Sequence, residues 1–424
     1  MLKRINYADL TQVLSRRKSE FLSRQKTVQA DVQSIIDSVI ERQDEAIIDW
    51  TNQFDGVQLD TFKVPSETLK KAYDSLAPNL QKALQNAYDS IASYHTLQTY
   101  TPLEDDQQGL YRAQKITPLD SVGLYVPGGT AAYPSSVLMN SVPAKIAGVK
   151  RIAMVTPPHP DGISATVLAA AHLCDIDAVY QVGGVQAIAA LAYGTPQIPA
   201  VAKIVGPGNL YVATAKHLLS SVVGIDQFAG PSEVCIWADH SVPVSFIAAD
   251  LIAQAEHDPL AQSIVMSDDE AILDAIDNEL SKQVKDRSRH SIIVSSLKNY
   301  GLSILLEDKA QGPSAINQIA PEHLELLIQK PRRVLSEIRH AGAIFLGPYT
   351  PEAMGDYMGG PNHTLPTSGT ATFASGLSTY DFLKRTSILE ISEERFTQMA
   401  DDVEALALEE HLDGHAESVR VRRK

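Results

Sequence analysis

Cysteine and long apolar runs are scarce in this sequence, and each shortage excludes a class of protein. Only two cysteines, Cys174 and Cys235, occur among 424 residues, and no charged segment leads into an apolar stretch with a cleavage site. We therefore expect a cytoplasmic protein without a disulfide framework. The most apolar predicted helix, 163–174, contains His172 and is shorter than the run of about 18 apolar residues that spans a membrane, so we expect no membrane insertion.

Positive charge is also in short supply. The chain has 51 Asp and Glu residues against 36 Lys and Arg residues, which gives a formal net charge of -15. Because nucleic acids bind basic surfaces, we expect no nucleic-acid partner. Hydrophobic residues make up 44% and charged residues 21% of the chain, as in an ordinary globular protein, and a chain of this length usually folds as two or more domains.

The spacing of apolar residues predicts helices in the first quarter of the chain and alternating strands and helices after Ser121. Segments 27–53 and 66–95 have the three-to-four spacing of amphipathic helices. The strands expected after that point are 121–126, 151–155, 178–182, 203–205, 234–238, 263–267, 291–295 and 343–346. Helical segments follow most of these strands, and such alternation is typical of parallel sheets covered by helices.

This pattern predicts an α/β fold with two Rossmann-like, incomplete parallel-sheet domains, a helical N-terminal region and an extended helical C-terminal tail. The tail includes an amphipathic helix at 392–410. The domains that we expect are an N-terminal arm at 1–20, a first α/β domain at 21–120 plus 232–377, a second α/β domain at 121–231, and the tail at 378–424.

Three glycine-rich turns follow strands of the second α/β domain, at 126–129, 182–184 and 205–209. Glycine after a strand lets backbone N–H groups approach a pyrophosphate at a helix N-terminus. The spacing G-x-G-x-x-G is absent, and each turn alone is typical of an ordinary strand-to-helix loop. Three such turns at the carboxyl edge of one sheet favour a nucleotide site, and the polar or aromatic side chains beside them are Tyr125, Gln186 and Asn209.

Four residues could form a metal site. Gln254 and His257 are three apart at the end of a predicted helix, so both side chains lie on one face. Asp356 and His415 would complete a four-ligand set of nitrogen and oxygen atoms, which zinc accepts. A histidine at a helix end is more often a surface group, glutamine is rarely a metal ligand, and no H-E-x-x-H motif is present, so the spacing of this pair alone favours a surface position without a metal.

A second polar group follows Pro321, where Glu322 and His323 are adjacent. Proline followed by glutamate is common at the start of a helix, and that reading needs no chemistry. Alternatively, the imidazole and the carboxylate could act as an acid/base pair. Ser232 and Glu233 precede a predicted strand, where they could simply form a turn.

Taken together, seven segments identify the chain as resembling the histidinol dehydrogenase family. They occur in the family's order, and the resemblance extends from about residue 20 to the C-terminus. The segments are GLYVPGG (123–129), GVQAIAAL (184–191), GPGN (206–209), AGPSEV (229–234), QAEHD (254–258), PEHL (321–324) and NHTLPT (362–367).

The resemblance implies a zinc-dependent oxidoreductase that uses two NAD to oxidise L-histidinol through L-histidinaldehyde to L-histidine, the last step of histidine biosynthesis. Glu322 and His323 would be the catalytic acid/base residues, and the NAD site would be at Tyr125, Gln186 and Asn209. The implied zinc ligands are Gln254, His257, Asp356 and His415. The implied substrate contacts are Ser232, Gln254, His257, His323, Asp356, Glu410 and His415.

The family also implies a homodimer in which the tail at 378–424 crosses to the partner, so that Glu410 and His415 complete the partner's site. Three other functions stay open at this point. The chain could be another zinc- and NAD-dependent amino-alcohol dehydrogenase of the same family, a zinc hydrolase that uses Glu322 to activate water, or a nucleotide-sensing protein without catalysis. No cysteine nucleophile is expected, because Cys174 ends a helix and Cys235 lies in an apolar strand.

Overall fold

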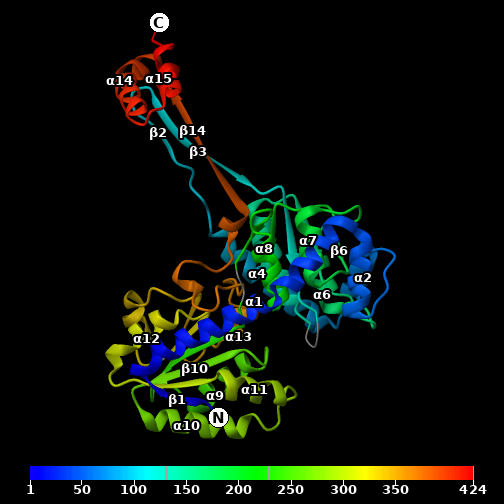
Figure 1. The fold of residues 1–424 in the computed structure, drawn as a ribbon. Helices are drawn as coiled ribbons and strands as arrows, with labels where there is room; N and C mark the ends of the chain where they lie inside the picture. The colour runs from blue at the N-terminus through cyan, green and yellow to red at the C-terminus, as the bar shows by residue number, and fades with distance from the viewer. Residues whose placement is uncertain (129–131, 228–229, 424) are drawn as a thin grey trace. The chain divides into compact units, whose positions relative to one another are not determined.

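The computed structural model describes residues 1–128, 132–227 and 230–423. This part of the chain forms two compact units, one made of Met1–Gln98 with Leu119–Asp381 and the other of Thr99–Pro118 with Phe382–Lys424. The first unit contains two parallel sheets with helices packed on them, and the second contains an antiparallel ribbon with two helices (Figure 1). Among the described residues, no helix combines the length and the apolar character that crossing a membrane requires.

The smaller parallel sheet has five strands in the order β6-β5-β4-β7-β8. Its strands are β4 (Ser121–Tyr125), β5 (Arg151–Val155), β6 (Ala178–Tyr180), β7 (Lys203–Val205) and β8 (Gly224–Ile225). The helices that follow them are α5 (Pro134–Ala147), α6 (Ala165–Leu173), α7 (Gly184–Tyr193) and α8 (Leu210–Leu218). All five residues of β4 are buried, as expected for a strand with helices on both faces.

Helices from the N-terminal quarter of the chain complete the covering of this sheet. The long helix α1 (Leu10–Arg42) packs on α7 and α8, and its buried residues Val32, Ile35, Ile36 and Val39 join one core with them. The other N-terminal helices are α2 (Asp44–Asp55), α3 (Ser66–Asp74) and α4 (Pro78–Thr96). Because α3 packs on α6 and α4 packs on α5, the predicted helical N-terminal region is part of the α/β framework.

The larger parallel sheet has six strands in the order β1-β11-β10-β9-β12-β13. Its strands are β1 (Lys3–Asn6), β9 (Glu233–Ala238), β10 (Gln262–Ser267), β11 (Leu302–Leu305), β12 (His323–Leu327) and β13 (Ala343–Leu346). Side chains alternate along β9, so Val234 and Ile236 join one core while Cys235 and Trp237 join the core on the opposite face.

Helices cover both faces of the larger sheet. The helices on the Val234 face are α9 (Val244–Ala255), α10 (Glu270–Gln283) and α11 (His290–Tyr300). On the Cys235 face, α12 (Gly312–Ile319) packs together with the start of α1. The short helix α13 (Glu352–Tyr357) follows β13. The predicted fold class, with two incomplete Rossmann-like parallel sheets, is confirmed.

Two local sequence predictions were wrong. The strand expected at 291–295 is part of α11, and the real strand is β11, which begins after it. The run Ile292, Ile293 and Val294 looks like a buried strand, but Ile293, Ser296 and Leu297 are buried at helical spacing. The proline before Glu322 starts no helix, because β12 begins at His323. Short apolar segments fit both structures, and packing decides between them.

The second unit is built around a three-stranded antiparallel ribbon in the order β14-β3-β2. Its strands are β2 (Glu104–Asp106), β3 (Leu110–Pro118) and β14 (Leu383–Ile391), and β14 pairs with β3 along its full length. The helices α14 (Glu393–Glu409) and α15 (Asp413–Arg420) pack against each other. The predicted tail helix at 392–410 therefore exists as α14. The domain boundaries expected from the sequence stay predictions.

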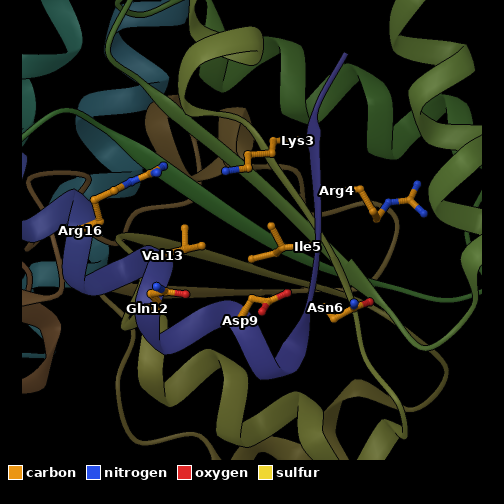
Figure 2. Close-up of a pocket in the computed structure, with 8 residues that line it drawn as sticks. All are labelled: Lys3, Arg4, Ile5, Asn6, Asp9, Gln12, Val13 and Arg16. Carbon is orange, nitrogen blue, oxygen red and sulfur yellow. The ribbon is translucent and has the colours of Figure 1, made fainter.

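A cavity of about 420 Å³ lies beside β1 and the beginning of α1. Its lining residues come from these two elements and the turn between them (Figure 2). They include Lys3, Arg4 and Arg16, and Arg4 already pairs with Glu270 and Asp274. None of the predicted site residues lines this cavity, so the candidate site lies elsewhere.

Candidate active site

The acid/base and metal candidates meet at the amino edge of the larger sheet. Strands β9 and β12 are parallel neighbours, and His323 pairs with Val234 in register. The connecting helix α9 runs back toward this edge, so its last turn lies near the first residues of the strands. One contact shows this, because the Glu233 N–H lies 3.3 Å from the amide oxygen of Gln254.

His323 is fixed by a backbone carbonyl. Its ring Nδ1 lies 3.2 Å from the carbonyl oxygen of Glu233, which can only accept a hydrogen bond, so Nδ1 carries the proton. The other ring nitrogen, Nε2, is buried and has no hydrogen-bond partner in the described part of the chain. Burial lowers the pKa of His323 to about 4, against the opposing effect of Asp356. The imidazole is therefore neutral near pH 7 and presents a free lone pair at Nε2.

Glu322 lies directly beside this imidazole. Its Oε2 accepts a hydrogen bond of 2.8 Å from the Glu233 N–H and lies 3.6 Å from His323 Nδ1. Burial raises the pKa of Glu322 well above the ordinary value, and the nearby carboxyl groups of Glu233 and Asp356 raise it further. A carboxylate of raised pKa is a stronger base than an exposed one. The backbone of Glu233 thus holds both members of the pair.

The side chain of Gln254 is held by the carboxylate of Glu352, a residue that is not among those predicted from the sequence. The side chain of Gln254 is fully buried. Its amide nitrogen faces both oxygens of Glu352, at 2.6 and 2.7 Å, and its amide oxygen faces the Glu233 N–H. Glu352 is itself 3% exposed, and its backbone N–H donates to Glu325 Oε1 at 2.8 Å. The carboxylate therefore determines which end of the Gln254 amide points toward the site.

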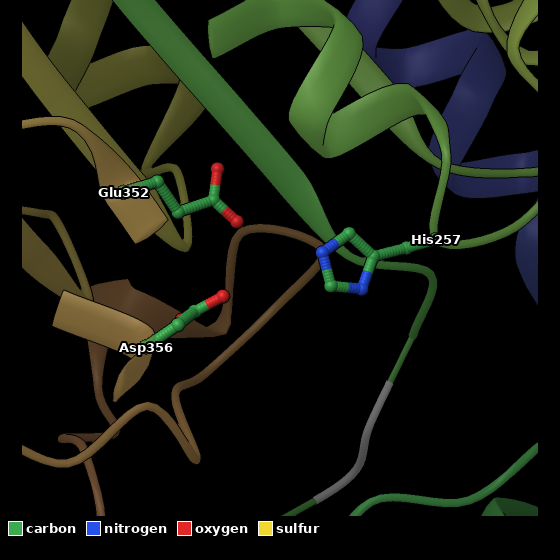
Figure 3. A group of neighbouring side chains, drawn as sticks. All are labelled: His257, Glu352 and Asp356. Carbon is green, nitrogen blue, oxygen red and sulfur yellow. The ribbon is translucent and has the colours of Figure 1, made fainter. Parts of the chain in front are cut away.

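Three side chains converge on one point of this edge (Figure 3). The ligand atoms of His257, Glu352 and Asp356 all lie within 4.8 Å of one another. With the neighbouring amide oxygen of Gln254, they offer one nitrogen and several oxygens, the donor set that zinc accepts. The donors fit such an ion.

The charges around this point favour an ionised Asp356. Burial acts to raise the pKa of Asp356, but the neighbouring His363, His323 and His257 lower it below its ordinary value. His363 Nδ1 lies 3.6 Å and His323 Nε2 3.9 Å from Asp356 Oδ1. Burial lowers the pKa of His257. A neutral imidazole and a carboxylate are the protonation states that bind metal ions.

A sequence signal for Glu352 existed. Glu352 and Asp356 are four residues apart on α13, a spacing that places both on one helix face. Gln254 and His257 are expected to share a helix face in the same way. The segment after Pro351 carries no apolar periodicity that would predict a helix, so the pairing of Glu352 with Asp356 is hard to predict from the sequence.

The remaining predicted substrate residues lie in different places. Ser232 is half-buried and directly precedes β9, beside the acid/base pair. Glu410 directly follows α14 and His415 lies in α15, so both belong to the second unit. The structure thus brings together Ser232, Gln254, His257, Glu322, His323 and Asp356.

The predicted cofactor residues gather at the carboxyl edge of the smaller sheet. Tyr125 ends β4, and its hydroxyl accepts a hydrogen bond of 3.2 Å from the Gly184 N–H. The ring of Tyr125 also lies beside the turn that contains Gly208. Asn209 caps α8, where its side-chain oxygen accepts bonds of 3.1 Å from two backbone N–H groups. Tyr125 therefore connects two of the three glycine-rich turns.

Gln186 completes this group from the first turn of α7. It is 1% exposed, and its amide oxygen has no hydrogen-bond partner among the described residues. The third turn, at 126–129, packs Gly128 against Pro157, while Gly129 lies outside the described residues. Ala229, which precedes Ser232 in the predicted motif, also lies outside them.

Comparison with known proteins agrees with this arrangement. The family model described as histidinol dehydrogenase matches residues 18–423. The chain belongs to the histidinol dehydrogenase family. Histidinol dehydrogenase from Listeria monocytogenes is 47% identical over 396 residues, 93% of each chain, and that from Caldanaerobacter subterraneus is 46% identical over 422 residues, 99% of this chain and 97% of the relative.

A solved structure from the histidinol dehydrogenase family has the same fold. The crystal structure of histidinol dehydrogenase from Elizabethkingia anophelis matches with a TM-score of 0.89 at 35% sequence identity, and the match covers 93% of this chain and 92% of that chain. The resemblance seen in the sequence is thereby confirmed over nearly the whole chain.

Neither cysteine can act as a nucleophile in this fold. Cys174 is 1% exposed and Cys235 is fully buried, and both are free thiols. Burial raises the pKa of Cys174 to about 12 and raises that of Cys235 even further. Since the thiolate is the reactive form, oxidation of an aldehyde here cannot proceed through either cysteine.

Proposed function

We propose that this chain oxidises L-histidinol through L-histidinaldehyde to L-histidine with two NAD, as the last step of histidine biosynthesis in the cytoplasm. The observation that carries the proposal is the meeting of Glu322 and His323 with the donors of Gln254, His257 and Asp356 at one sheet edge. Family membership supports the same substrate.

The proposed zinc site uses Gln254, His257 and Asp356 of one chain and His415 of the tail. When bound, zinc supplies a Lewis acid for the nitrogen atoms of histidinol and thereby positions the carbinol carbon. The residues fit this role because the amide nitrogen of Gln254 is occupied by Glu352, which leaves its oxygen as the donor. Ser232 and Glu410 would contact the bound substrate.

His323 acts first in the proposed mechanism. Its neutral imidazole accepts the hydroxyl proton at Nε2 while a hydride leaves the carbinol carbon, since Nδ1 is engaged by the Glu233 carbonyl. Glu322 then removes a proton from water so that the aldehyde is hydrated, and a second hydride leaves the resulting gem-diol. The balance is one water consumed, two hydrides transferred to two NAD, and three protons released, one each from the alcohol hydroxyl, the gem-diol and the carboxylic acid product. No covalent enzyme intermediate is needed, which agrees with the buried thiols.

The proposed NAD site lies at Tyr125, Gln186 and Asn209. NAD supplies the hydride acceptor when bound. The buried amide oxygen of Gln186 accepts no hydrogen bond from the described residues and is available to a ligand. The turns at 182–184 and 205–209 place backbone N–H groups at the starts of α7 and α8. These features support a nucleotide at this edge.

The proposal includes a homodimer. Glu410 and His415 would come from the tail of the partner subunit, so each site would use residues of two chains. The exposed apolar side chains of the second unit, among them Leu389 at 64% and Leu406 at 66% exposure, support a partner surface there.

The decisive experiment follows NADH formation from L-histidinol with the purified protein. We expect about two NADH for each histidine, because two hydrides leave the substrate. Chelation should abolish the activity and zinc should restore it. One NADH for each alcohol would indicate an ordinary amino-alcohol dehydrogenase, turnover without NAD would indicate a hydrolase, and NAD binding without turnover would indicate a sensor. Each of these results would overturn the proposal.

A further inference from the structure

We propose that a buried ion pair, Lys216 with Asp226, positions the glycine turn at 206–209 and thereby sets the affinity for NAD. The inference rests on the proposed function for its ligand, because NAD is the nucleotide proposed at this turn. Neither residue is assigned a role in the acid/base or metal chemistry. Both belong to the first unit, Lys216 on α8 and Asp226 directly after β8.

The pair is almost completely removed from solvent. The side chains of Lys216 and Asp226 are 2% and 3% exposed, and the ammonium donates a hydrogen bond to Asp226 Oδ1. Lysine is rarely buried to this extent unless it is paired. A buried ion pair contributes little net stability, because the loss of hydration offsets most of the attraction. General stability is therefore a weak explanation for placing two charges here.

Both members of the pair bind the backbone of the same residue of the turn, Gly206. Lys216 Nζ donates to the carbonyl oxygen of Gly206 at 3.0 Å, and the Gly206 N–H donates to Asp226 Oδ2 at 2.7 Å. The two polar backbone groups of Gly206 are thus held by opposite charges. The ion pair and the glycine form a closed hydrogen-bonded set that fixes the direction of the chain as it leaves β7.

Gly206 needs such a restraint because its backbone is unusual. Its φ of +112 lies where residues with side chains rarely occur, and an added Cβ would lie 2.2 Å from the carbonyl oxygen of Tyr125. Glycine has the greatest conformational freedom of all residues, so an unrestrained Gly206 would sample other conformations. Those conformations would move Gly208 and Asn209 relative to Tyr125.

The consequence for ligand binding is preorganisation. A turn that is already in its binding conformation loses less entropy when a ligand binds. Asn209 caps α8 and Lys216 lies on the same helix, so the ion pair fixes the N-terminus of α8 as well as the turn. Loss of the pair should weaken NAD binding and leave the distant donors around His257 in place.

The test measures NAD and histidinol binding to Lys216→Met by calorimetry on the zinc-loaded full chain. We expect the dissociation constant for NAD to rise about tenfold or more and that for histidinol to change less than about twofold. The matched control is Lys203→Met. Lys203 lies on β7 just before the turn, and its ammonium donates to the carbonyl of Asp381 at 2.8 Å without touching Gly206. This control should bind NAD normally.

A second variant separates the loss of the ion pair from misfolding caused by an unpaired buried charge. Lys216→Met alone leaves a buried carboxylate unpaired, whereas Lys216→Met with Asp226→Asn removes both charges and keeps an acceptor for the Gly206 N–H. The folded double variant should still bind NAD several-fold more weakly, because the Gly206 carbonyl lacks its donor. Unchanged NAD affinity in the folded double variant would overturn the inference. Absence of NAD binding by the unaltered protein would overturn the proposed function instead.

Discussion

At the scale of single residues, the backbone N–H and C=O of one residue, Glu233, hold both members of the proposed acid/base pair. The N–H of Glu233 donates to Glu322, and its C=O holds Nδ1 of His323. The side chain of Glu233 is buried too, with its Oε1 accepting a bond of 2.9 Å from the Ser368 N–H, and burial raises its pKa to about 7. The two reactive groups are therefore oriented by backbone atoms, which no substitution of a side chain removes directly.

The division of labour between Glu322 and His323 gives the first prediction. Glu322→Gln should slow oxidation of the aldehyde by about 100-fold or more and affect oxidation of the alcohol much less, because only the aldehyde step requires water to be activated. Single-turnover NADH formation, started from histidinol and separately from histidinaldehyde, measures both steps. Equal losses at the two steps would refute this division.

Glu352 gives a prediction about the metal. Glu352→Gln should weaken zinc binding about 10- to 100-fold, because the new amide cannot accept two N–H bonds from Gln254 and so no longer fixes that side chain. Competition with a chromophoric chelator measures the affinity.

The matched control for Glu352 is Glu256→Gln. This change removes a negative charge next to His257 and leaves the side-chain partners of Gln254, Glu352 and the Glu233 N–H, in place. If both variants lost the same affinity, charge alone would explain the effect and the orienting role of Glu352 would be wrong.

At the scale of secondary-structure elements, the two parallel sheets use opposite edges. The glycine-rich turns follow the carboxyl ends of strands in the smaller sheet, where open α/β folds usually bind ligands. The acid/base and metal candidates lie instead before β9 and β12 and after α9, at the amino edge of the larger sheet. The candidate residues meet at that edge because α9 runs back to the amino ends of β9 and β12.

The segment rich in Gly, Pro, Ser and Thr, 359–376, links elements of both sheets. The side chain of Asn362 donates to the carbonyl of Met139 in α5, and the Gly230 N–H donates to Thr367 at 2.6 Å. Gln227 donates to the carbonyl of Leu365. Apart from a short 3-10 helix at Thr370–Thr372, this segment lies outside helices and strands, so its polar groups can bond to these partners.

The end of α2 gives a prediction about pH and stability. Burial raises the pKa of Asp55 to about 6, so the folded protein holds this proton more tightly than the unfolded chain. The resulting stability is present at low pH and is lost as the pH rises from about 4 through about 6. At pH 8, Asp55→Asn should raise the free energy of unfolding by about 1 kcal/mol, a value reduced for partial exposure.

Urea unfolding at pH 4 and pH 8 checks the Asp55 prediction. The gain from Asp55→Asn should largely disappear at pH 4, where the carboxyl is protonated in the folded protein and about half protonated in the unfolded chain. The control Asp60→Asn removes one negative charge at an exposed position shortly after α2, so an equal gain in both variants would assign the effect to net charge. An equal gain for Asp55→Asn at both pH values would show that burial of its charge is not the cause.

At the scale of the whole molecule, the chain places its predicted site residues in two units. Six lie in the first unit at the edge of the larger sheet, while Glu410 and His415 lie in the second. The second unit is held together by the full-length pairing of β3 with β14, segments that are far apart in the sequence. Because β14 pairs with β3, the tail is anchored to a strand from an earlier part of the chain.

Mixing two variants that are impaired in histidine formation tests the proposed exchange of tails. His415→Ala and Glu322→Gln chains, mixed and allowed to exchange subunits, should recover about a quarter of the wild-type rate of histidine formation. Half of the dimers are then mixed, and each mixed dimer has one site with both native residues. Activity no greater than that of the separate variants, despite subunit exchange shown by mass spectrometry, would mean that each site uses its own tail.

Much of this architecture could be predicted because the sequence pattern is local. Alternating apolar strands and helices predicted two parallel sheets, and glycine-rich turns after Tyr125 and Val205 predicted tight connections at the carboxyl edge of the smaller sheet. The weak points were short segments such as 291–295, where an apolar run fits a strand or a buried helix equally well. The strand β1 was missed because four residues carry too little pattern.

The sequence by itself determined the fold class and the family, since both depend on residue order and local spacing. Only the tertiary structure decided that Glu352 holds Gln254, that a backbone carbonyl selects the tautomer of His323, and that Lys216 and Asp226 share Gly206. The physical reason is the separation along the chain over which each kind of signal acts. Periodicity acts over a few residues, whereas these contacts join residues separated by 10 to 98 positions whose approach depends on how the sheets and helices pack.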